Sequence, residues 1–316
     1  MRFKLCLALV MFVCFSVLQA QPSQLSSEQP SLVIAVVVDQ MRYDYLARYG
    51  SEFNGGLKRL LTQGAVFTNA NYEAVPTVTA IGHSTILSGA TPSLSGIAGN
   101  SWYSRNEGKS VQSITDDEVS GLGIDGGASP KRLLVTTIGD ELKNSGKGGK
   151  VYGVSLKDRS AILPAGRNAD GAFWLNSGNF VSSSWYFPAL PDWALEFNAQ
   201  NRADAFAGVD WMGTTMPDSP GRELYAALDA TPFADQLVLE FALEVLSQET
   251  LGKGPKTDLL SVSFSAMDYL GHASGPDTQS MKAMVLSLDE KIGQLLSAAE
   301  KQAGRGNVLL VMTADH

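Results

Sequence analysis

Four short apolar runs constrain the fold of this chain more than any other feature. They cover residues 32–38, 150–156, 259–264 and 308–312. Each run is rich in branched side chains and is followed at once by polar residues, which is typical of buried parallel strands. Between them the apolar spacing changes to the helical period. The sequence therefore predicts a three-layer α/β/α fold with a mostly parallel central sheet.

Three helices are expected between or after these strands, over about 129–146, 231–252 and 281–304. Ser129-Pro130 and Thr231-Pro232 each offer a cap followed by a proline at the first helical position. The third segment carries apolar residues at three-and-four spacing and ends near a glycine.

The region 164–221 breaks this alternation, because it is rich in Trp, Phe, Asn, Ser and Gly without a clear period. It is interpreted as an insertion that forms a cap over the site. Its large aromatic residues are expected to pack in the core of the insertion rather than to line a substrate pocket: Trp174, Trp185, Tyr186 and Trp193.

The amino terminus differs from the rest of the chain. Arg2 and Lys4 precede an apolar run over 5–18, and Ala20 offers a small residue for cleavage, so residues 1–20 are predicted to be a secretory signal peptide. A transmembrane anchor is the alternative, but the run is shorter than the roughly 20 residues that a bilayer requires. We expect a periplasmic or secreted protein without a stable membrane anchor, with a polar linker over 21–30 and one α/β domain over 31–316.

Cysteine content and charge exclude several classes of protein. Cys6 and Cys14 both lie within the predicted signal peptide, so a disulfide scaffold, thiolate zinc sites and cysteine catalysis are excluded for the mature chain. The chain has 24 basic and 32 acidic residues and a net charge of −8, which argues against a nucleic-acid-binding surface. A small anionic ligand in one basic pocket remains compatible with this charge.

Acids and histidines follow three of the predicted strands: Asp39, then Asp268 and His272, then Asp315 and His316. Ligands of open α/β sheets bind at the carboxyl ends of the strands. Carboxylate and imidazole groups suit zinc, and their number exceeds the needs of one four-coordinate ion with an open position. They fit two ions about 4 Å apart, an arrangement used for phosphoryl transfer. The alternative is that the acids cap helices or turns and the histidines have other partners.

A threonine pair supplies a candidate nucleophile. Thr77 and Thr79 precede an apolar segment that is predicted to be helical, which puts a hydroxyl near a helix amino terminus. A hydroxyl bound to a metal is activated as a nucleophile. A simple threonine cap is the alternative, and the spacing does not choose between the two residues.

Two cations follow the second apolar run. Lys157 and Arg159 are two residues apart, so on an extended segment they would face the same side. An ammonium and a guanidinium together match the charge and shape of a phosphate monoester dianion. A solvated pair at a strand end is the alternative.

Taken in order, these residues resemble the alkaline phosphatase superfamily, on its branch of type I phosphodiesterases and nucleotide pyrophosphatases. Within that branch the sequence is most similar to the phosphate-irrepressible, flavobacterial-type alkaline phosphatases. The motifs that carry the resemblance are 37–42, 76–79 with 82–83, 96–100, 153–159, 268–272 and 313–316. The resemblance implies an alkaline-phosphatase-like fold and a small phosphate-ester substrate.

The resemblance also implies roles for individual residues. Thr79 is expected to be the nucleophile, and Asn100, Lys157 and Arg159 are expected to contact the phosphate oxygens. Two zinc ions are expected, and their ligands divide into two groups: Asp39, Thr79, Asp315 and His316 for one ion, and Asp268 and His272 for the other. No role is carried over to His83, which is expected to be structural.

The resulting hypothesis is a secreted, two-zinc phosphate monoesterase that works through a phosphothreonine. A phosphodiesterase or nucleotide pyrophosphatase on the same scaffold is the first alternative. In the family the second zinc takes a further histidine from downstream, and this sequence ends at His316. We therefore expect the amino-terminal part of a longer enzyme, and the second alternative is a catalytically incomplete chain or an exported protein without turnover.

Overall fold

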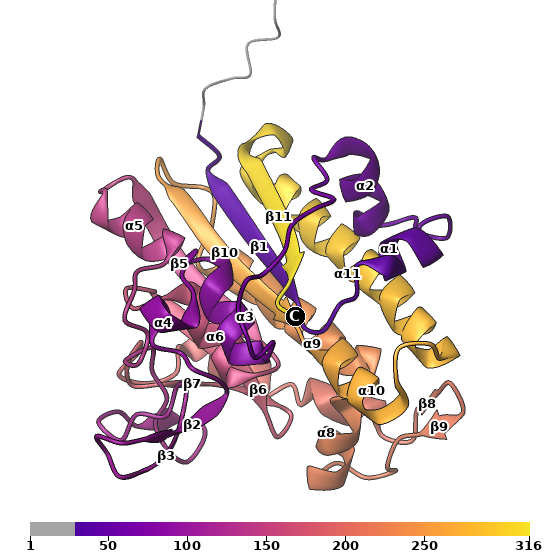
Figure 1. Ribbon diagram of the computed structural model, residues 1–316. Helices are drawn as coiled ribbons and strands as arrows, with labels where there is room; N and C mark the ends of the chain where they lie inside the picture. Colours follow the sequence, from indigo (N-terminus) through magenta and orange to yellow (C-terminus); the bar gives the residue numbers. More distant parts are fainter. Residues whose placement is uncertain (1–28) are drawn as a thin grey trace, which may run out of the picture.

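The computed structural model describes residues 29–316 (Figure 1). The predicted signal peptide and all but the last two residues of the predicted linker lie outside the described residues. Within the described part of the chain, no helix has the length and apolar character needed to cross a membrane.

The strands and helices alternate along the chain. The strands are β1 (Leu32–Val38), β2 (Ser101–Ser104), β3 (Lys109–Gln112), β4 (Gly121–Leu122), β5 (Gly148–Ser155), β6 (Gly171–Asn176), β7 (Asn179–Ser183), β8 (Asp210–Trp211), β9 (Thr214–Thr215), β10 (Thr257–Phe264) and β11 (Val308–Ala314). The α-helices are α1 (Asp44–Tyr49), α2 (Gly56–Gln63), α3 (Thr79–Ile86), α4 (Pro92–Ser95), α5 (Ile138–Asn144), α6 (Asp158–Ala165), α7 (Asp192–Asn198), α8 (Arg222–Leu228), α9 (Pro232–Gln248), α10 (Ala266–Ser274) and α11 (Gln279–Ala303). Two short 3₁₀ helices cover Arg202–Phe206 and Arg305–Asn307.

The central sheet has the strand order β11-β1-β10-β5-β6-β7-β4. The first five strands are parallel and the last two pair antiparallel. All four apolar runs form strands, so the predicted mostly parallel sheet is confirmed. The expectation of full burial is wrong for β11, because it lies at the edge of the sheet and leaves Leu309 and Val311 about half exposed.

Helices cover both faces of this sheet (Figure 1). On β1, Leu32, Ile34 and Val36 belong to the main core cluster together with buried residues of α9 and α11. Val33 and Ala35, which point to the opposite face, lie on the side of α3, α5 and α6. The alternation of side chains along a strand thus produces the predicted three layers.

Two of the three predicted helices are confirmed. α9 begins after a Thr231 cap, and α11 ends at Gly304. The first prediction is wrong at its start, since α5 begins at Ile138 rather than near residue 130. A capping box decides this boundary: Thr137 and Asp140 each bond the other's backbone N–H, which satisfies two free donors of the first turn.

The predicted insertion over 164–221 is wrong in part, because β6 and β7 belong to the central sheet. β6 pairs in parallel with β5, and β7 returns beside it. Trp174 on β6 is almost fully buried, and Trp193 and Tyr186 pack against the core clusters of the domain, so these three pack in a core as expected, but not in a separate core of the insertion. Trp185 is half-buried, belongs to neither cluster and donates its Nε1–H to the Arg167 carbonyl at 3.3 Å. Buried aromatic side chains on adjacent strands, rather than a separate cap, account for this composition.

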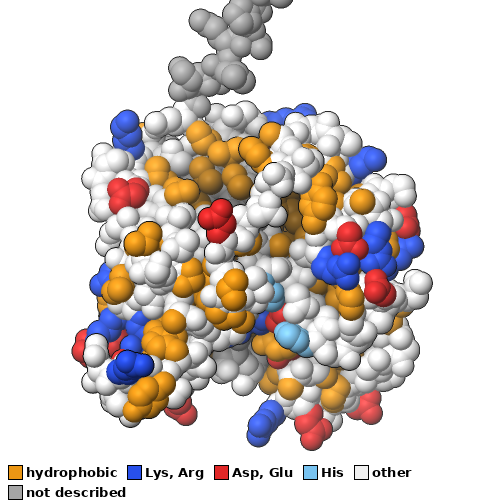
Figure 2. Space-filling view, in the orientation of Figure 1, with side chains coloured by type: hydrophobic (Ala, Val, Ile, Leu, Met, Phe, Trp, Pro, Cys, Tyr) orange, Lys and Arg blue, Asp and Glu red, His pale blue; other side chains and the backbone are white. Residues whose placement is uncertain are grey.

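An apolar groove of about 630 Å³ lies on the α5 side of the sheet near β11. It is lined by side chains such as Val33, Leu87, Ile138, Leu259 and Val311, and none of the candidate site residues lines it. Figure 2 shows hydrophobic side chains gathered in a hollow of this part of the surface.

A buried carboxylate on α11 fixes α2. Asp289 accepts the backbone N–H groups of Asn54 (2.8 Å), Gly55 (2.7 Å) and Lys58 (3.1 Å) at the start of that helix. Asp289→Ala leaves these donors without their acceptor, so we expect it to lower the free energy of unfolding by about 2–4 kcal/mol. Denaturant unfolding measures this loss. Glu290→Ala is the control, because Glu290 is the exposed neighbour of Asp289. An equal loss of unfolding free energy in Glu290→Ala contradicts the prediction.

Candidate active site

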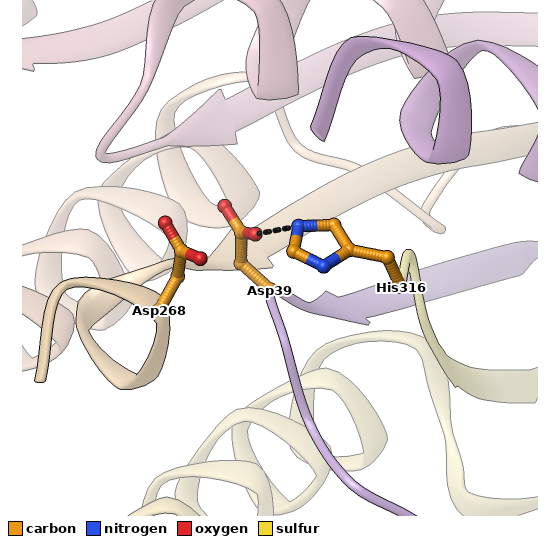
Figure 3. Close-up of side chains that lie close together, drawn as sticks. All are labelled: Asp39, Asp268 and His316. Atoms are coloured by element: carbon orange, nitrogen blue, oxygen red, sulfur yellow. Dashed lines mark ion pairs between the residues drawn. The ribbon is translucent and has the colours of Figure 1, made fainter. Parts of the chain in front are cut away.

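Three side chains from three parallel strands meet at the carboxyl edge of the sheet (Figure 3). Asp39 follows β1 directly, Asp268 lies in the first turn of α10 after β10, and His316 follows β11. One ligand atom from each lies within 4.8 Å of the others, and His316 Nε2 is 3.2 Å from Asp39 Oδ1. The expectation that strand ends gather acids and histidines at one edge is confirmed.

The two remaining predicted ligands flank this cluster. Asp315 Oδ2 lies 3.7 Å from His316 Nε2, and His272 Nε2 lies 3.2 Å from Asp268 Oδ1. Asp315 is fully buried as a side chain, whereas that of His272 is 73% exposed. The cluster therefore extends from a buried end at Asp315 to an open end at His272.

The donor set fits a metal ion. Asp39 Oδ1 and Asp315 Oδ2 are buried, and within residues 29–316 neither accepts a hydrogen bond of good geometry. Each has an imidazole nitrogen close by instead: His316 Nε2 is 3.2 Å from Asp39 Oδ1, and His83 Nδ1 is 3.0 Å from Asp315 Oδ2. Buried carboxylate oxygens ordinarily have partners, so two that lack them beside an imidazole are suited to hold a cation. Carboxylate and imidazole donors without thiolates match the chemistry of zinc.

Lys157 brings a buried positive charge into the same cluster. Its Nζ donates to Asp39 Oδ2 at 2.7 Å and to Asp268 Oδ2 at 2.5 Å. Burial alone lowers the pKa of Lys157, but the charges of Asp39 and Asp268 outweigh it and raise the pKa above its usual value. Lys157 is therefore an ammonium ion in the centre of the site.

The cluster also changes the protonation of its own members. Burial alone raises the pKa of Asp39, but the neighbouring His316 and Lys157 outweigh it and hold that pKa well below its usual range. Burial alone lowers the pKa of His316, and the adjacent Asp39 and Asp315 carboxylates raise it overall. A proton on His316 competes with a metal ion for the same nitrogen, so metal binding at this site is expected to weaken in acid.

Lys157 and Arg159 do not lie on an extended segment, and that prediction is wrong. Lys157 is the residue before α6, and Arg159 lies in the first turn of that helix. The Arg159 Nε is buried and has no hydrogen-bond partner among the described residues, although the side chain as a whole is 25% exposed. The guanidinium thus has one buried N–H donor without a partner among the described residues.

The structure distinguishes the two threonines. Thr79 is the first residue of α3 and is buried, while Thr77 is exposed in the preceding segment. His83, four residues after Thr79, lies on the same face of α3, and its Nδ1 is 3.0 Å from Asp315 Oδ2. A Cβ on Gly82 would lie 2.2 Å from the Asp315 carbonyl oxygen, so α3 packs directly against this predicted ligand.

Asn100 also lies at the start of α3. Its Oδ1 accepts the N–H of Ala80 at 2.9 Å. With its oxygen engaged there, the Asn100 amide retains its NH₂ group as a donor beside Thr79. The structure thus brings Asn100 and Thr79 to one helix terminus.

Two contacts were not foreseen from the sequence. His83, to which no role was carried over, is buried and contacts Asp315, and its Nε2 lies 2.8 Å from Ser263 Oγ. Gln40 contacts Asp268 through its side-chain amide at 2.7 Å. Only their positions in the sequence could have indicated these contacts: His83 is one helical turn after Thr79, and Gln40 directly follows Asp39.

A carboxylate of α9 holds the start of α10, the helix that carries Asp268. Asp235 Oδ1 accepts the N–H groups of Ser265 and Ala266 at 3.1 and 3.2 Å. Burial raises the pKa of Asp235 to about 6. This carboxyl group therefore orients the helix without belonging to the ligand cluster.

These features define an α/β protein with a candidate metal centre, a helix-terminal hydroxyl, a buried lysine and a partly exposed arginine beyond the ends of a parallel sheet. The sequence matches the type I phosphodiesterase / nucleotide pyrophosphatase family over residues 33–316. The chain belongs to this family.

Its relatives include named alkaline phosphatases. The chain is 36% identical to alkaline phosphatase PhoV of Synechococcus elongatus over 99% of its own length and 65% of the relative's. It is 37% identical to alkaline phosphatase PafA of Elizabethkingia meningoseptica over 91% of its length and 60% of PafA. The chain thus spans less than two thirds of the length of these relatives.

The fold matches solved structures of PafA. Wild-type PafA superposes with a TM-score of 0.83 at 37% identity, covering 92% of this chain and 63% of that one. A PafA variant in which one Thr, one Asn, one Lys and one Arg are replaced gives the same TM-score at 35% identity, with the same coverage of both chains. The alkaline-phosphatase-like α/β architecture predicted from the sequence is therefore confirmed.

Proposed function

We propose that this protein is a secreted, metal-dependent alkaline phosphatase that hydrolyses phosphate monoesters. The observation that carries the proposal is the buried cluster of Asp39, Asp268 and His316, with the Lys157 ammonium between the two carboxylates. Similarity to relatives named alkaline phosphatases supports it. Secretion is supported by the pattern of residues 1–20, and amino-terminal sequencing of the exported protein should find cleavage after Ala20.

Zinc is the proposed metal, with two ions in a complete site. Asp39, Thr79, Asp315 and His316 form one ligand group, and Asp268 and His272 belong to the other. Bound zinc supplies positive charge that stabilises phosphoryl oxygens and lowers the pKa of a coordinated hydroxyl. Elemental analysis of the purified chain tests this assignment: close to two zinc ions per chain supports it, and close to none favours the incomplete-chain alternative.

Thr79 is the proposed nucleophile. Its Oγ1 attacks phosphorus while the hydroxyl proton passes to solvent, and the ester P–O bond breaks. The leaving oxygen takes up a proton and departs as the alcohol. Water then attacks the phosphothreonine, which releases phosphate and restores the hydroxyl. Two in-line displacements give net retention of configuration at phosphorus.

Asn100, Lys157 and Arg159 are the proposed contacts to the phosphoryl oxygens. The free donor of Arg159 and the NH₂ group of Asn100 are available for this role, and Lys157 already carries its charge at the carboxylate cluster. The four residues replaced in the PafA variant are of the same types as the four proposed here, namely one Thr, one Asn, one Lys and one Arg. An ammonium and a guanidinium suit a dianionic monoester better than a singly charged diester.

A phosphodiesterase or nucleotide pyrophosphatase is the second candidate, because the matching family carries that description. Rates on an aryl phosphate and on the corresponding diaryl phosphate separate the two. Faster turnover of the monoester supports the phosphatase, whereas faster turnover of the diester overturns it.

Arg159→Ala sharpens this comparison. Loss of a charge-assisted contact worth about 1.5–3 kcal/mol should lower kcat/KM on the monoester by about 10- to 100-fold and should affect the diester much less. Arg105→Ala, which removes an exposed arginine, is the matched control. Equal losses on both substrates would speak against a role for Arg159 in recognising the dianion.

A further inference from the structure

Gln40 has an unusual backbone conformation. Its φ angle is +62°, in the left-handed region that long side chains rarely adopt. It directly follows Asp39 at the carboxyl end of β1. Strained residues of this kind persist where surrounding contacts require them, and they concentrate at functional sites.

The left-handed conformation lets one residue contact both predicted ligand groups. The backbone N–H of Gln40 donates to Asp315 Oδ1 at 3.1 Å. The side-chain Nε2 donates to Asp268 Oδ1 at 2.7 Å and lies 3.4 Å from His272 Nε2. Asp315 and His272 are at opposite ends of the cluster, so Gln40 spans it next to Asp39.

The neighbouring helix leaves room for this side chain. A Cβ on Gly271 of α10 would lie only 2.2 Å from Gln40 Oε1. Glycine at this position therefore leaves space for Gln40 Oε1 against α10, while Gln40 Nε2 donates to the Asp268 carboxylate of the same helix. The oxygen and the nitrogen of the Gln40 amide thus both lie next to the helix that carries Asp268 and His272.

We propose that Gln40 is a positioning residue that sets the orientation of the Asp268 and His272 group relative to the Asp315 and His316 group. The inference rests on the metal centre of the proposed function. A hydrogen bond to one carboxylate oxygen fixes the direction of the other, and such partners of metal ligands commonly change metal affinity by about 10- to 100-fold when they are removed.

Gln40→Gly separates the side-chain contacts from the backbone conformation. Glycine adopts a positive φ without a steric cost and retains the N–H donor to Asp315, while the amide contact to Asp268 is lost. Gln40→Met keeps a similar length but removes the donor. Ser177→Gly is the matched control, because Ser177 also has a positive φ (49°) and is exposed in the turn between β6 and β7.

The parent and the three variants are compared by two measurements. One is zinc affinity, from competition with a chromogenic chelator, and the other is the Tm of the metal-free chain. Gln40→Gly and Gln40→Met should each bind zinc about 10- to 100-fold more weakly than the parent. The Tm of metal-free Gln40→Gly should be unchanged or raised. Ser177→Gly should keep the parent's affinity. The visible spectrum of bound cobalt(II), which reports ligand geometry, should change in both Gln40 variants only.

Parental zinc affinity in Gln40→Gly overturns the inference, as does a loss of affinity accompanied by an equal loss of fold stability. If the parent binds zinc and both Gln40 variants bind it equally well, the role of Gln40 is contradicted but the proposed metal centre is not. Absence of zinc binding by the parent overturns the proposed metal centre and this inference together.

Discussion

Thr79→Ala should lower turnover of an aryl phosphate by more than about a thousandfold, because loss of a nucleophile removes the covalent route and leaves only the contribution of binding groups. Thr79 is the buried first residue of α3, on the face that packs against Asp315. The substitution removes one hydroxyl and one methyl group at a helix start, so the fold should persist. Steady-state kinetics and a circular dichroism spectrum test the two statements.

The same motif provides the control. Thr77 is exposed, so Thr77→Ala removes an equivalent hydroxyl two residues earlier and should retain nearly all activity. Trapping of radiolabelled phosphate on the protein adds an independent readout, since the label should appear on the parent and on Thr77→Ala but not on Thr79→Ala. Substantial residual turnover in Thr79→Ala, or loss of activity only in Thr77→Ala, would refute this assignment.

Asp39→Asn should have the second large effect. Asp39 lies between His316 and Lys157, and both its oxygens face the cluster. An amide is a much weaker metal ligand than a carboxylate, so zinc affinity should fall by more than about a hundredfold and activity should fall with it. Removing the metal from the parent with a chelator should give the same loss of activity, and added zinc should restore it only in the parent.

Asp44→Asn provides the matched control for charge. Asp44 is a partly exposed carboxylate at the start of α1 that pairs with Arg42 and Arg48 at the surface. Its substitution makes the same change in net charge away from the cluster, and exposed pairs of this kind contribute little to stability. A parental zinc content in Asp39→Asn, or equal losses in the two variants, would contradict a metal-binding role for Asp39.

Much of the fold was predictable because its signals are local. A buried parallel strand needs a short branched apolar run, and β1 matches its predicted bounds at both ends. Where competing local signals existed, prediction failed. Ser129-Pro130 has the form of a helix start, but the capping box of Thr137 and Asp140 fixes the actual one. β6 and β7 were missed because their aromatic residues are buried by neighbours that are distant in sequence.

The candidate site was predictable to the level of residue types and strand ends. Lys157 illustrates the limit, since an extended segment was expected and the chain turns into α6 immediately after it. Its contacts to Asp39 and Asp268 join residues 118 and 111 positions away. No local spacing encodes such a distance.

By itself, the sequence determined which side chains follow each buried strand, because an apolar run and the polar residue after it are adjacent in the chain. Parallel pairing then requires those residues to share one edge of the sheet. Only the tertiary structure decided how they meet there. The pairing of β1 with both β10 and β11 brings Asp39 to Asp268 and His316, and packing of α3 against Asp315 brings Thr79 to the same edge. The left-handed residue Gln40 links Asp315 to Asp268, and its hydrogen-bond partners are up to 275 residues away, so no local pattern indicates it.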